Sequence, residues 1–279
     1  MNNNQWAGIV DLSMGNYNKI YGNYFYSCGS DKYHHNIYIN SQWGTCSYID
    51  IGWNEFDHSV NSDHYGGIID MRTASGTPYS NHIYVHDNYF HDGDDDAIYV
   101  SDEGGKINNF YAYNNVISNM TNTGAALVLI QQDANSGIYN NTFYYAAGAS
   151  GNFFAIGSGT VCPFKNNIIY PRTGQTLLEL VGTYNSDYDL YYNVSVPSGA
   201  THAVTGDPKF VTNGSDFHLQ SSSPAKDAGI SAVSSIVKKD YDGISRPQNS
   251  VYDIGAFEYR LSTLDRTPSS PPIGLRIVN

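Results

Sequence analysis

The sequence is poor in basic residues and in long apolar runs, and each shortage excludes a class of protein. Its 279 residues carry 14 Lys and Arg against 26 Asp and Glu, a formal net charge of -12. This balance argues against a nucleic acid or an anionic membrane surface as the partner. No stretch approaches the roughly 18 consecutive apolar residues of a membrane-spanning helix. We therefore expect no nucleic-acid partner and no membrane span.

Cysteine is also scarce. Cys28, Cys46 and Cys162 are too few for a disulfide scaffold, and their spacing fits no zinc motif. A disulfide between Cys28 and Cys46 is one option in an oxidising compartment, and free thiols are the other. Only 14% of the residues are charged, whereas 25 are Tyr and 27 are Gly, with many Asn and Ser. Strand and turn formers therefore predominate over helix formers.

One short segment recurs along the chain. In each copy an apolar residue, a residue that faces outward and a second apolar residue come before an Asn. The copies are IYGNYF (20–25), IDIGWNEF (49–56), IYVHDNYF (83–90), FYAYNNVI (110–117), GIYNNTF (137–143), FKNNII (164–169) and DLYYNV (189–194). The Asn residues of these copies are Asn23, Asn54, Asn88, Asn115, Asn141, Asn167 and Asn193. Successive Asn residues are 31, 34, 27, 26, 26 and 26 positions apart. Because this spacing becomes constant along the chain, it predicts coils stacked about 4.8 Å apart. We expect the Asn column to form a structural hydrogen-bonded ladder.

A second set of strands recurs in phase with the first. Its members are HNIYIN (35–40), GIIDMR (67–72), AIYVSD (97–102), ALVLIQ (126–131), FFAIGS (153–158) and LLELVG (177–182). Short strands joined by Gly, Asn and Asp corners predict an all-β fold, a right-handed parallel β-helix over residues 1–200. Extra residues in the early coils, around Ser27–Lys32, Asp57–Tyr65 and Thr73–Ser80, indicate the binding face.

The C-terminal part of the chain departs from the repeat. Its segments GDPKF (206–210), DFHLQSSSPAKDAG (216–229), DYDGISRP (240–247) and DIGAFEY (253–259) resemble the C-terminal end of bacterial parallel β-helix proteins of the pectin-lyase-like superfamily. The resemblance implies a secreted or cell-surface protein, although residues 1–6 show no signal pattern. We expect residues 201–260 to cap the open end of the solenoid and 261–279 to form a Pro/Ser-rich linker or tail. We also expect a monomer.

Aligning the second strand set by its inward residues predicts a polar patch. The inward column is Ile37, Ile69, Ile98 and Leu127, and the outward neighbours are Tyr38, Asp70, Tyr99 and Val128. The next outward column is Asn40, Arg72, Ser101 and Ile130. The same alignment brings His34 and His35 beside Gly66 and Gly67 and beside Asp95 and Asp96. This patch is the candidate active site, although His and Asp at β-helix corners also serve as plain turn residues.

The patch and the fold resemble the polysaccharide lyases of the same superfamily in general terms, and no motif fixes one family. Such lyases remove the proton next to a uronate carboxylate while calcium or another cation neutralises that carboxylate. The resemblance makes Arg72 the first candidate for base or carboxylate clamp, with Asp70 as its orienting partner. The other catalytic candidates are His35, His64, Lys32, Lys106 and Tyr99. The candidate polysaccharide-binding residues are Tyr38, Asn40, Trp53, Tyr84, His86 and Glu103.

The acidic run HDGDDDAIYVSDEG (91–104) is a candidate calcium site, because clustered carboxylates repel one another unless a cation relieves them. The candidate ligands are Asp94, Asp95, Asp96 and Asp102, and a plain turn is the alternative. Gly93, Asp94, Asp95 and Ile98 resemble the Gly-Asp-Asp segment of polygalacturonases. The Asn-Thr-Asp, Gly-His-Gly and Arg-Ile-Lys segments of those enzymes are absent from this chain.

Three functions fit the sequence. The leading hypothesis is a secreted lyase that cleaves a uronate-containing polysaccharide around Arg72. A glycoside hydrolase would instead use a carboxylate pair drawn from Asp70, Asp95, Asp96 and Glu103. A non-catalytic, adhesin-like solenoid would bind glycan without cutting it.

Overall fold

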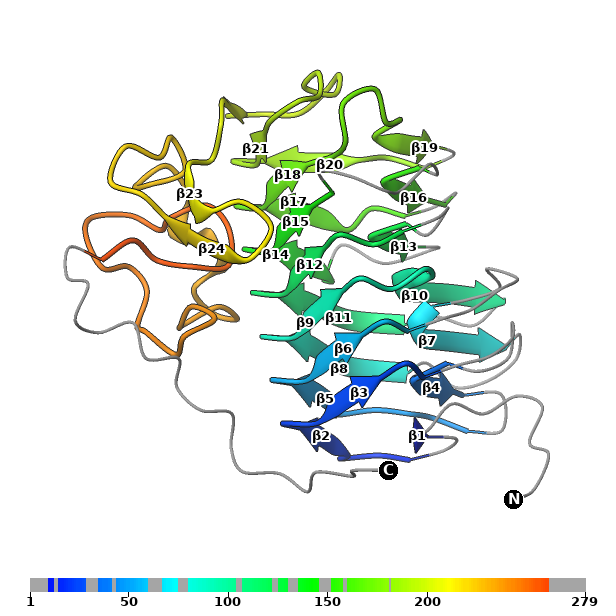
Figure 1. Ribbon diagram of the computed structural model, residues 1–279. Helices are drawn as coiled ribbons and strands as arrows, with labels where there is room; N and C mark the ends of the chain where they lie inside the picture. The colour runs from blue at the N-terminus through cyan, green and yellow to red at the C-terminus, as the bar shows by residue number, and fades with distance from the viewer. Residues whose placement is uncertain are drawn as a thin grey trace.

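Three parallel sheets wind into a parallel β-helix, in which every third strand of the chain joins the same sheet (Figure 1). The computed structural model describes residues 10–12, 15–28, 35–41, 44–59, 67–74, 80–103, 107–121, 125–129, 135–145, 152–157, 160–180 and 182–260. The expected all-β fold and the stacking of coils are confirmed. In the described part of the chain, no helix is long and apolar enough to cross a membrane.

The strands of the three sheets follow one another around each coil. Sheet A holds β1 (Val10–Asp11), β4 (Ile37–Asn40), β7 (Gly67–Ala74), β10 (Asp96–Glu103), β13 (Leu127–Leu129), β16 (Phe154–Ile156) and β19 (Leu178–Leu180). Sheet B holds β2 (Lys19–Tyr21), β5 (Ile49–Gly52), β8 (Ser80–His86), β11 (Ile107–Tyr113), β14 (Gly137–Tyr139), β17 (Pro163–Lys165) and β20 (Asn185–Asp187). Sheet C holds β3 (Tyr24–Tyr26), β6 (Glu55–Asp57), β9 (Tyr89–His91), β12 (Val116–Ser118), β15 (Thr142–Tyr144), β18 (Ile168–Tyr170), β21 (Leu190–Tyr191) and β22 (Val204–Thr205).

The core lies inside the coils, where alternate residues of each strand stack on their equivalents in the next coil. In sheet A the stacked residues are Ile37, Ile69, Ile98, Leu127 and Phe154, all almost completely buried. In sheet C the rings of Phe25, Phe56 and Phe90 stack with centroids 4.8 and 4.6 Å apart. Burial of these apolar columns is the main stabilising contribution, because each coil covers the apolar surface of the next.

The asparagine ladder forms at the corner between sheets B and C. Each Asn Oδ1 accepts hydrogen bonds from both the backbone N–H and the Nδ2 of its equivalent in the preceding coil, at 2.7 to 3.1 Å. From Asn54 to Asn167, Nδ2 also donates to a backbone carbonyl of the preceding coil. The ladder thereby satisfies corner groups that the sheets leave unpaired.

The last rung of the ladder is Asp189, so the prediction of Asn193 there was wrong. Asp189 Oδ1 accepts from Asn167, and Asn193 is exposed. One left-handed residue precedes each rung, and the series is Gly22, Trp53, Asp87, Asn114, Asn140, Asn166 and Tyr188. The final step is therefore 22 residues. A carboxylate oxygen can end the ladder because the terminal position only has to accept.

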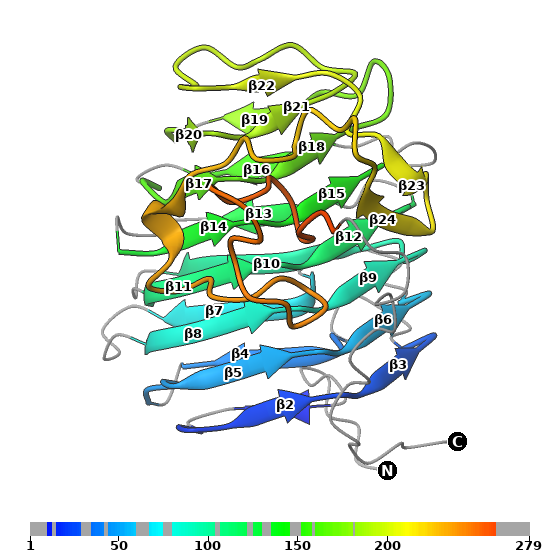
Figure 2. The same ribbon diagram turned by 90° about the vertical axis from the view of Figure 1, so that its left-hand side faces the viewer.

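The C-terminal segment packs along the side of the solenoid, over the corner between sheets B and C (Figures 1 and 2). Asn114, Asn140 and Asn166 donate their amide hydrogens to the carbonyls of Lys239, Asp253 and Ile230. The segment includes β23 (Phe210–Thr212), β24 (Asp216–Leu219) and the 3-10 helix η1 (Ser231–Val233). Phe210, Phe217 and Ile254 bury apolar residues of sheet C. Within the segment expected to cap the solenoid, residues 201–260, β22 extends the last coil and the later residues pack along the side of sheet C.

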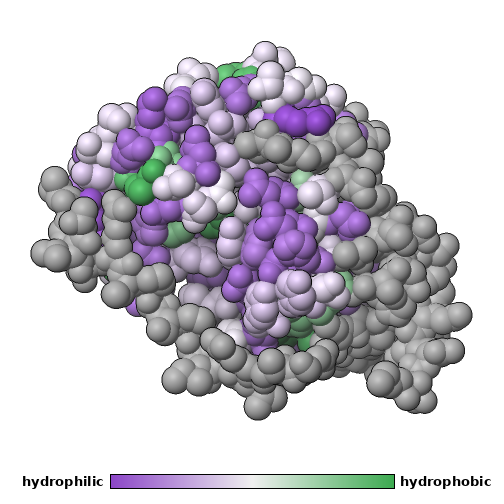
Figure 3. All heavy atoms as spheres, viewed as in Figure 1, coloured by the Kyte–Doolittle hydropathy of each residue, from purple (hydrophilic) through white to green (hydrophobic). Residues whose placement is uncertain are grey.

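Two further expectations concern the cysteines and the surface. Cys28, Cys46 and Cys162 are free thiols, so the structure supports the second of the two options for Cys28 and Cys46. The described surface in Figure 3 is mostly hydrophilic, with small hydrophobic areas. The expected tail from residue 261 onward lies outside the described residues.

Candidate functional site

The register of sheet A brings the predicted catalytic residues together. Tyr38, Asp70, Tyr99 and Val128 are successive neighbours across β4, β7, β10 and β13. Asn40, Arg72 and Ser101 form the adjacent column. The alignment made from the sequence is therefore confirmed at these positions, and residues more than twenty positions apart in the chain share one face.

Arg72 is the partly exposed cation of this face, and Asp70 fixes its position. Arg72 Nε lies 3.0 Å from Asp70 Oδ1, and Nη2 lies 3.1 Å from Asp70 Oδ2. The Asp70 side chain is 0% exposed and that of Arg72 is 11% exposed. The Arg72 guanidinium also lies 5.1 Å from the centroid of the Tyr99 ring, a cation–π contact. Asp70 can therefore orient Arg72, but it is too buried to contact a substrate.

His35 places its imidazole ring against Asp70. His35 Nδ1 lies 2.9 Å from the carbonyl oxygen of Gly67, which can only accept, so Nδ1 carries a proton. His35 Nε2 lies 3.3 Å from Asp70 Oδ2 and is best matched to that carboxylate when it is protonated too. The ring stacks on Tyr38 at a centroid distance of 5.3 Å. The geometry thus favours an imidazolium, which leaves Asp70 between two positive groups.

Asp96 and Tyr99 of β10 can both transfer a proton, but only Tyr99 is the register neighbour of Asp70, whereas Asp96 is the neighbour of Gly67. Burial raises the pKa of Asp96 to about 7, a hydrogen bond from the Ala125 N–H opposes the rise, and the charge of Asp70 adds to it. Burial also raises the pKa of Tyr99, against the lowering effect of Arg72. At neutral pH Asp96 can therefore take up or release a proton, whereas Tyr99 stays protonated and can donate one.

The insertions predicted to mark the binding face join sheet A to its neighbours. The segment after Cys28 leads into β4, and the segments on either side of Gly67–Ala74 flank β7. In the chain, these segments therefore directly precede or follow strands of the sheet that carries Arg72. Loops with this placement on a rigid scaffold often carry binding residues.

Several predicted residues cannot be placed. Lys32, His64 and Lys106 lie outside the described residues, as do the side chains of Asp102 and Glu103. Asp95 is buried, and the Asp94 N–H donates to the carbonyl of Ser59 at 2.9 Å. In the described part of the acidic run, Asp94, Asp95 and Asp96 do not form a group of closely spaced ligand atoms.

Other predicted residues lie on a different face. Tyr84 and His86 are in β8 of sheet B, and Trp53 is at the corner that follows β5. His86 is buried between Asp50 and Asp87, with Nε2 2.7 Å from Asp50 Oδ1 and Nδ1 2.6 Å from Asp87 Oδ2. These residues therefore do not line the Arg72 face, and the His86 ring is occupied by protein groups.

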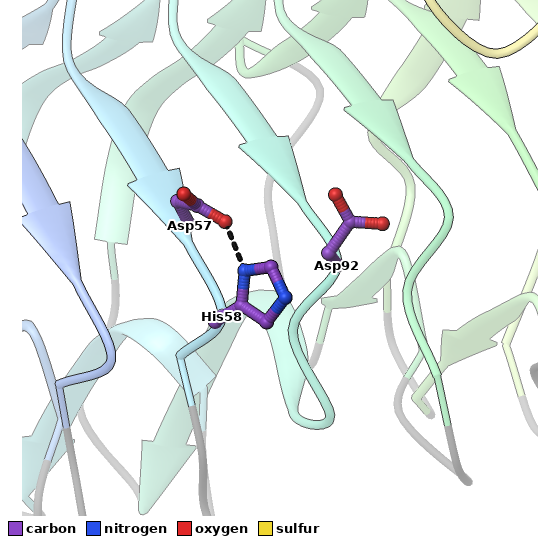
Figure 4. A group of neighbouring side chains, drawn as sticks. All are labelled: Asp57, His58 and Asp92. Carbon is purple, nitrogen blue, oxygen red and sulfur yellow. Dashed lines mark hydrogen bonds and ion pairs between the residues drawn. The ribbon is translucent and has the colours of Figure 1, made fainter.

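The described residues whose ligand atoms are close enough to hold a metal ion are Asp57, His58 and Asp92, on sheet C (Figure 4). None of them was a predicted site residue. The dipeptides Asp57-His58 and His91-Asp92 directly follow the stacked Phe56 and Phe90 in successive coils. Comparing residues just after the ladder Asn, coil by coil, would have found them.

Comparison of the sequence with models of known protein families and with curated proteins finds no match.

Proposed function

We propose that this chain is a secreted or cell-surface polysaccharide lyase that cleaves a uronate-containing polymer on the outer face of sheet A. The observation that carries the proposal is the partly exposed Arg72 guanidinium, fixed by the buried Asp70 and by the Tyr99 ring. A planar guanidinium held in one orientation is suited to a carboxylate, the group that distinguishes uronates from neutral sugars. The resemblance of the C-terminal segment to that of pectin-lyase-like proteins supports secretion, and it does not bear on the activity.

The proposed reaction is a β-elimination. Arg72 binds the uronate carboxylate and stabilises the negative charge that develops when the neighbouring carbon loses its proton. The base that accepts that proton is assigned to the predicted candidates Lys32, His64 and Lys106, because Asp96 lies five residues along β10 from Ser101, the register neighbour of Arg72. The electron pair forms a carbon–carbon double bond as the glycosidic C–O bond breaks, and Tyr99 donates a proton to the leaving oxygen.

Neutralisation of the substrate carboxylate is assigned to Arg72 in this mechanism, and no step requires calcium. The described carboxylates of the acidic run do not gather ligand atoms as a calcium ion requires. Calcium binding by this run stays a separate proposal.

Hydrolysis is the second candidate, and the pKa of Asp96 favours it. A carboxyl group with a raised pKa is the usual general acid of a glycoside hydrolase. Its partner cannot be Asp70, which is fully buried. Asp95 is buried as well, so hydrolysis needs Glu103 as the second carboxylate.

The test is to incubate the protein with pectate and with alginate, measuring both ultraviolet absorbance from unsaturated ends and the release of reducing ends. A lyase produces both signals, and a hydrolase produces only reducing ends. We expect Arg72→Gln to lower turnover about 100-fold or more, and Tyr99→Phe to lower it about 10-fold or more. Arg72→Lys keeps a charge against Asp70 but loses the planar fork, so its activity should fall in between.

Arg172→Gln is the matched control for Arg72, because it removes a partly exposed arginine outside sheet A. Tyr111→Phe, on sheet B, is the control for Tyr99. Circular dichroism should show that each variant keeps its strands. Binding of oligosaccharide without cleavage would replace the lyase with a glycan-binding solenoid. Absence of both binding and cleavage on every polymer would refute the proposal.

A further inference from the structure

Two imidazoles and two carboxylates lie together at the C-terminal ends of β6 and β9 in sheet C. Asp57 in β6 is the register neighbour of His91 in β9, and the residues that follow them are His58 and Asp92. The His58 N–H also donates to the His91 carbonyl at 3.2 Å, which holds the two corners together. The stacking of coils therefore places two Asp/His dipeptides in reversed order side by side.

The ligand atoms of three of these four residues converge. One atom each from Asp57, His58 and Asp92 lies within 4.8 Å of the others (Figure 4). His58 Nδ1 contacts Asp57 Oδ1, and His91 Nδ1 lies 2.8 Å from Asp92 Oδ2 and 3.5 Å from Asp57 Oδ1. His58 and Asp92 are 58% and 42% exposed, so an ion can enter from solvent and keep water ligands.

Neighbouring side chains hold these ligands from behind. The Tyr24 hydroxyl donates to Asp57 Oδ2 at 2.6 Å, so the second oxygen of that carboxylate is already engaged. Glu55 Oε1 lies 3.1 Å from His91 Nε2, which leaves His91 Nδ1 directed at the group. Hydrogen bonds of this kind to the remote atoms of carboxylate and imidazole ligands orient a metal site.

The donor chemistry indicates which ion fits. Two imidazole nitrogens with two carboxylate oxygens match zinc and similar transition metals, whereas calcium takes oxygen ligands. The group contains more acidic than basic side chains, because the three carboxylates of Asp57, Asp92 and Glu55 surround only two imidazoles. A divalent ion supplies the missing positive charge.

We propose that Asp57, His58, His91 and Asp92 bind a zinc-class divalent ion at the C-terminal ends of β6 and β9 in sheet C, where it links two successive coils. The ligands lie in β6, β9 and the corners after them, whereas Arg72 lies in β7 on sheet A. The proposal therefore does not rest on the lyase assignment, and its test uses no polysaccharide.

The test is calorimetric titration of zinc chloride into the intact protein after dialysis against a chelator. We expect about one ion per chain, and about 100-fold or more weaker binding in His58→Ala and in Asp92→Asn. Glu55→Gln, which changes only a supporting residue, should weaken binding about 10-fold. Zinc should also raise the melting temperature of the parent protein but not of His58→Ala, because the ion binds only the folded chain.

The matched control is His202→Ala combined with Asp187→Asn. His202 is a 63% exposed histidine whose Nδ1 lies 2.8 Å from Asp187 Oδ1, so it repeats the Asp/His contact at a distant coil. Zinc binding should survive this change. Loss of binding in the control as in His58→Ala would show non-specific capture by surface histidines and overturn the assignment. The assignment is also overturned if zinc does not bind, or if calcium binds this group as tightly as zinc.

Discussion

Replacing His86 should remove a buried cation that joins several coils. His86 Nε2 faces Asp50 and Nδ1 faces Asp87, while the ring stacks on Tyr113 at a centroid distance of 4.8 Å. The ring fits because residue 52 is glycine, where a Cβ would lie 2.7 Å from His86 Cε1. Asn114 Nδ2 donates to the other oxygen of Asp87, which extends the network to a further coil.

The two carboxylates hold the proton on His86. Burial lowers the pKa of His86, but hydrogen bonds and charge interactions with Asp50 and Asp87 outweigh it and raise the pKa from 6.5 to about 9. This rise corresponds to about 3 kcal/mol of folding free energy. Because the folded-state pKa is the higher one, the stabilisation is complete below about pH 6.5 and is lost as the pH rises through about 9.

We therefore expect His86→Gln to lower the free energy of unfolding by about 3 kcal/mol at about pH 6 and by less than about 1 kcal/mol at about pH 10. Urea denaturation followed by circular dichroism at both pH values measures the two differences. His202→Gln removes an exposed histidine and should change stability little at either pH. An equal loss for His86→Gln at both pH values would mean that packing, and not charge, accounts for the effect.

Three further predictions concern the ladder and the acidic run. Burial raises the pKa of Asp189 from 3.8 to about 7, so ionised Asp189 lowers the stability of the folded protein as the pH rises through this range. Asp189→Asn should therefore increase the free energy of unfolding by up to about 4 kcal/mol near pH 8 and change it little near pH 3. Urea denaturation at the two pH values measures both differences. Asn115→Ala should cost about 2 to 4 kcal/mol in the same assay, because it leaves the Asn88 N–H and amide without their acceptor. If the run Asp94–Asp96 binds calcium, saturating calcium should raise the melting temperature and a chelator should reverse it; an unchanged melting temperature contradicts that site.

The register of sheet A could be predicted because its signal is local and repeated. Ile37, Ile69 and Ile98 each sit at an alternating position in a strand, so matching the apolar residues fixed the outward columns that contain Asp70 and Arg72. The same reasoning missed Asp189, since it assumed a constant step and an Asn at every rung. The residue type at each rung is set by the hydrogen bonds it must form. The last rung only has to accept hydrogen bonds, so an Asp can replace the Asn there.

The position of the C-terminal segment could not be predicted because it depends on Asn residues that already fit the repeat. In the pairs Asn114-Asn115, Asn140-Asn141 and Asn166-Asn167 the second Asn forms the ladder. The first has a left-handed backbone and donates to the C-terminal segment. A doubled Asn at successive corners therefore indicates two partners, one within the solenoid and one packed against its side.

Burial was the least predictable property of the candidate site. Tyr38 and Asp70 point away from the coil interior, yet they are 6% and 0% exposed, so outward orientation on a β-helix strand does not imply contact with solvent. The strand pattern reports which face a side chain occupies, whereas its exposure depends on what packs above that face. Proximity of charged residues was therefore predictable, but the division between a buried Asp70 and a partly exposed Arg72 was not.

The histidines of the early coils differ in what they can do chemically, and their partners decide it. His86 and His91 each have carboxylates at both ring nitrogens, and these carboxylates raise both pKa values against the lowering effect of burial. His35 has a carbonyl at one nitrogen and Asp70 at the other, so it too is best satisfied as a cation. The proton-transfer group next to Arg72 is therefore Tyr99, because Asp96 lies five residues along β10 from the register neighbour of Arg72, and the histidines serve to position the surrounding charges.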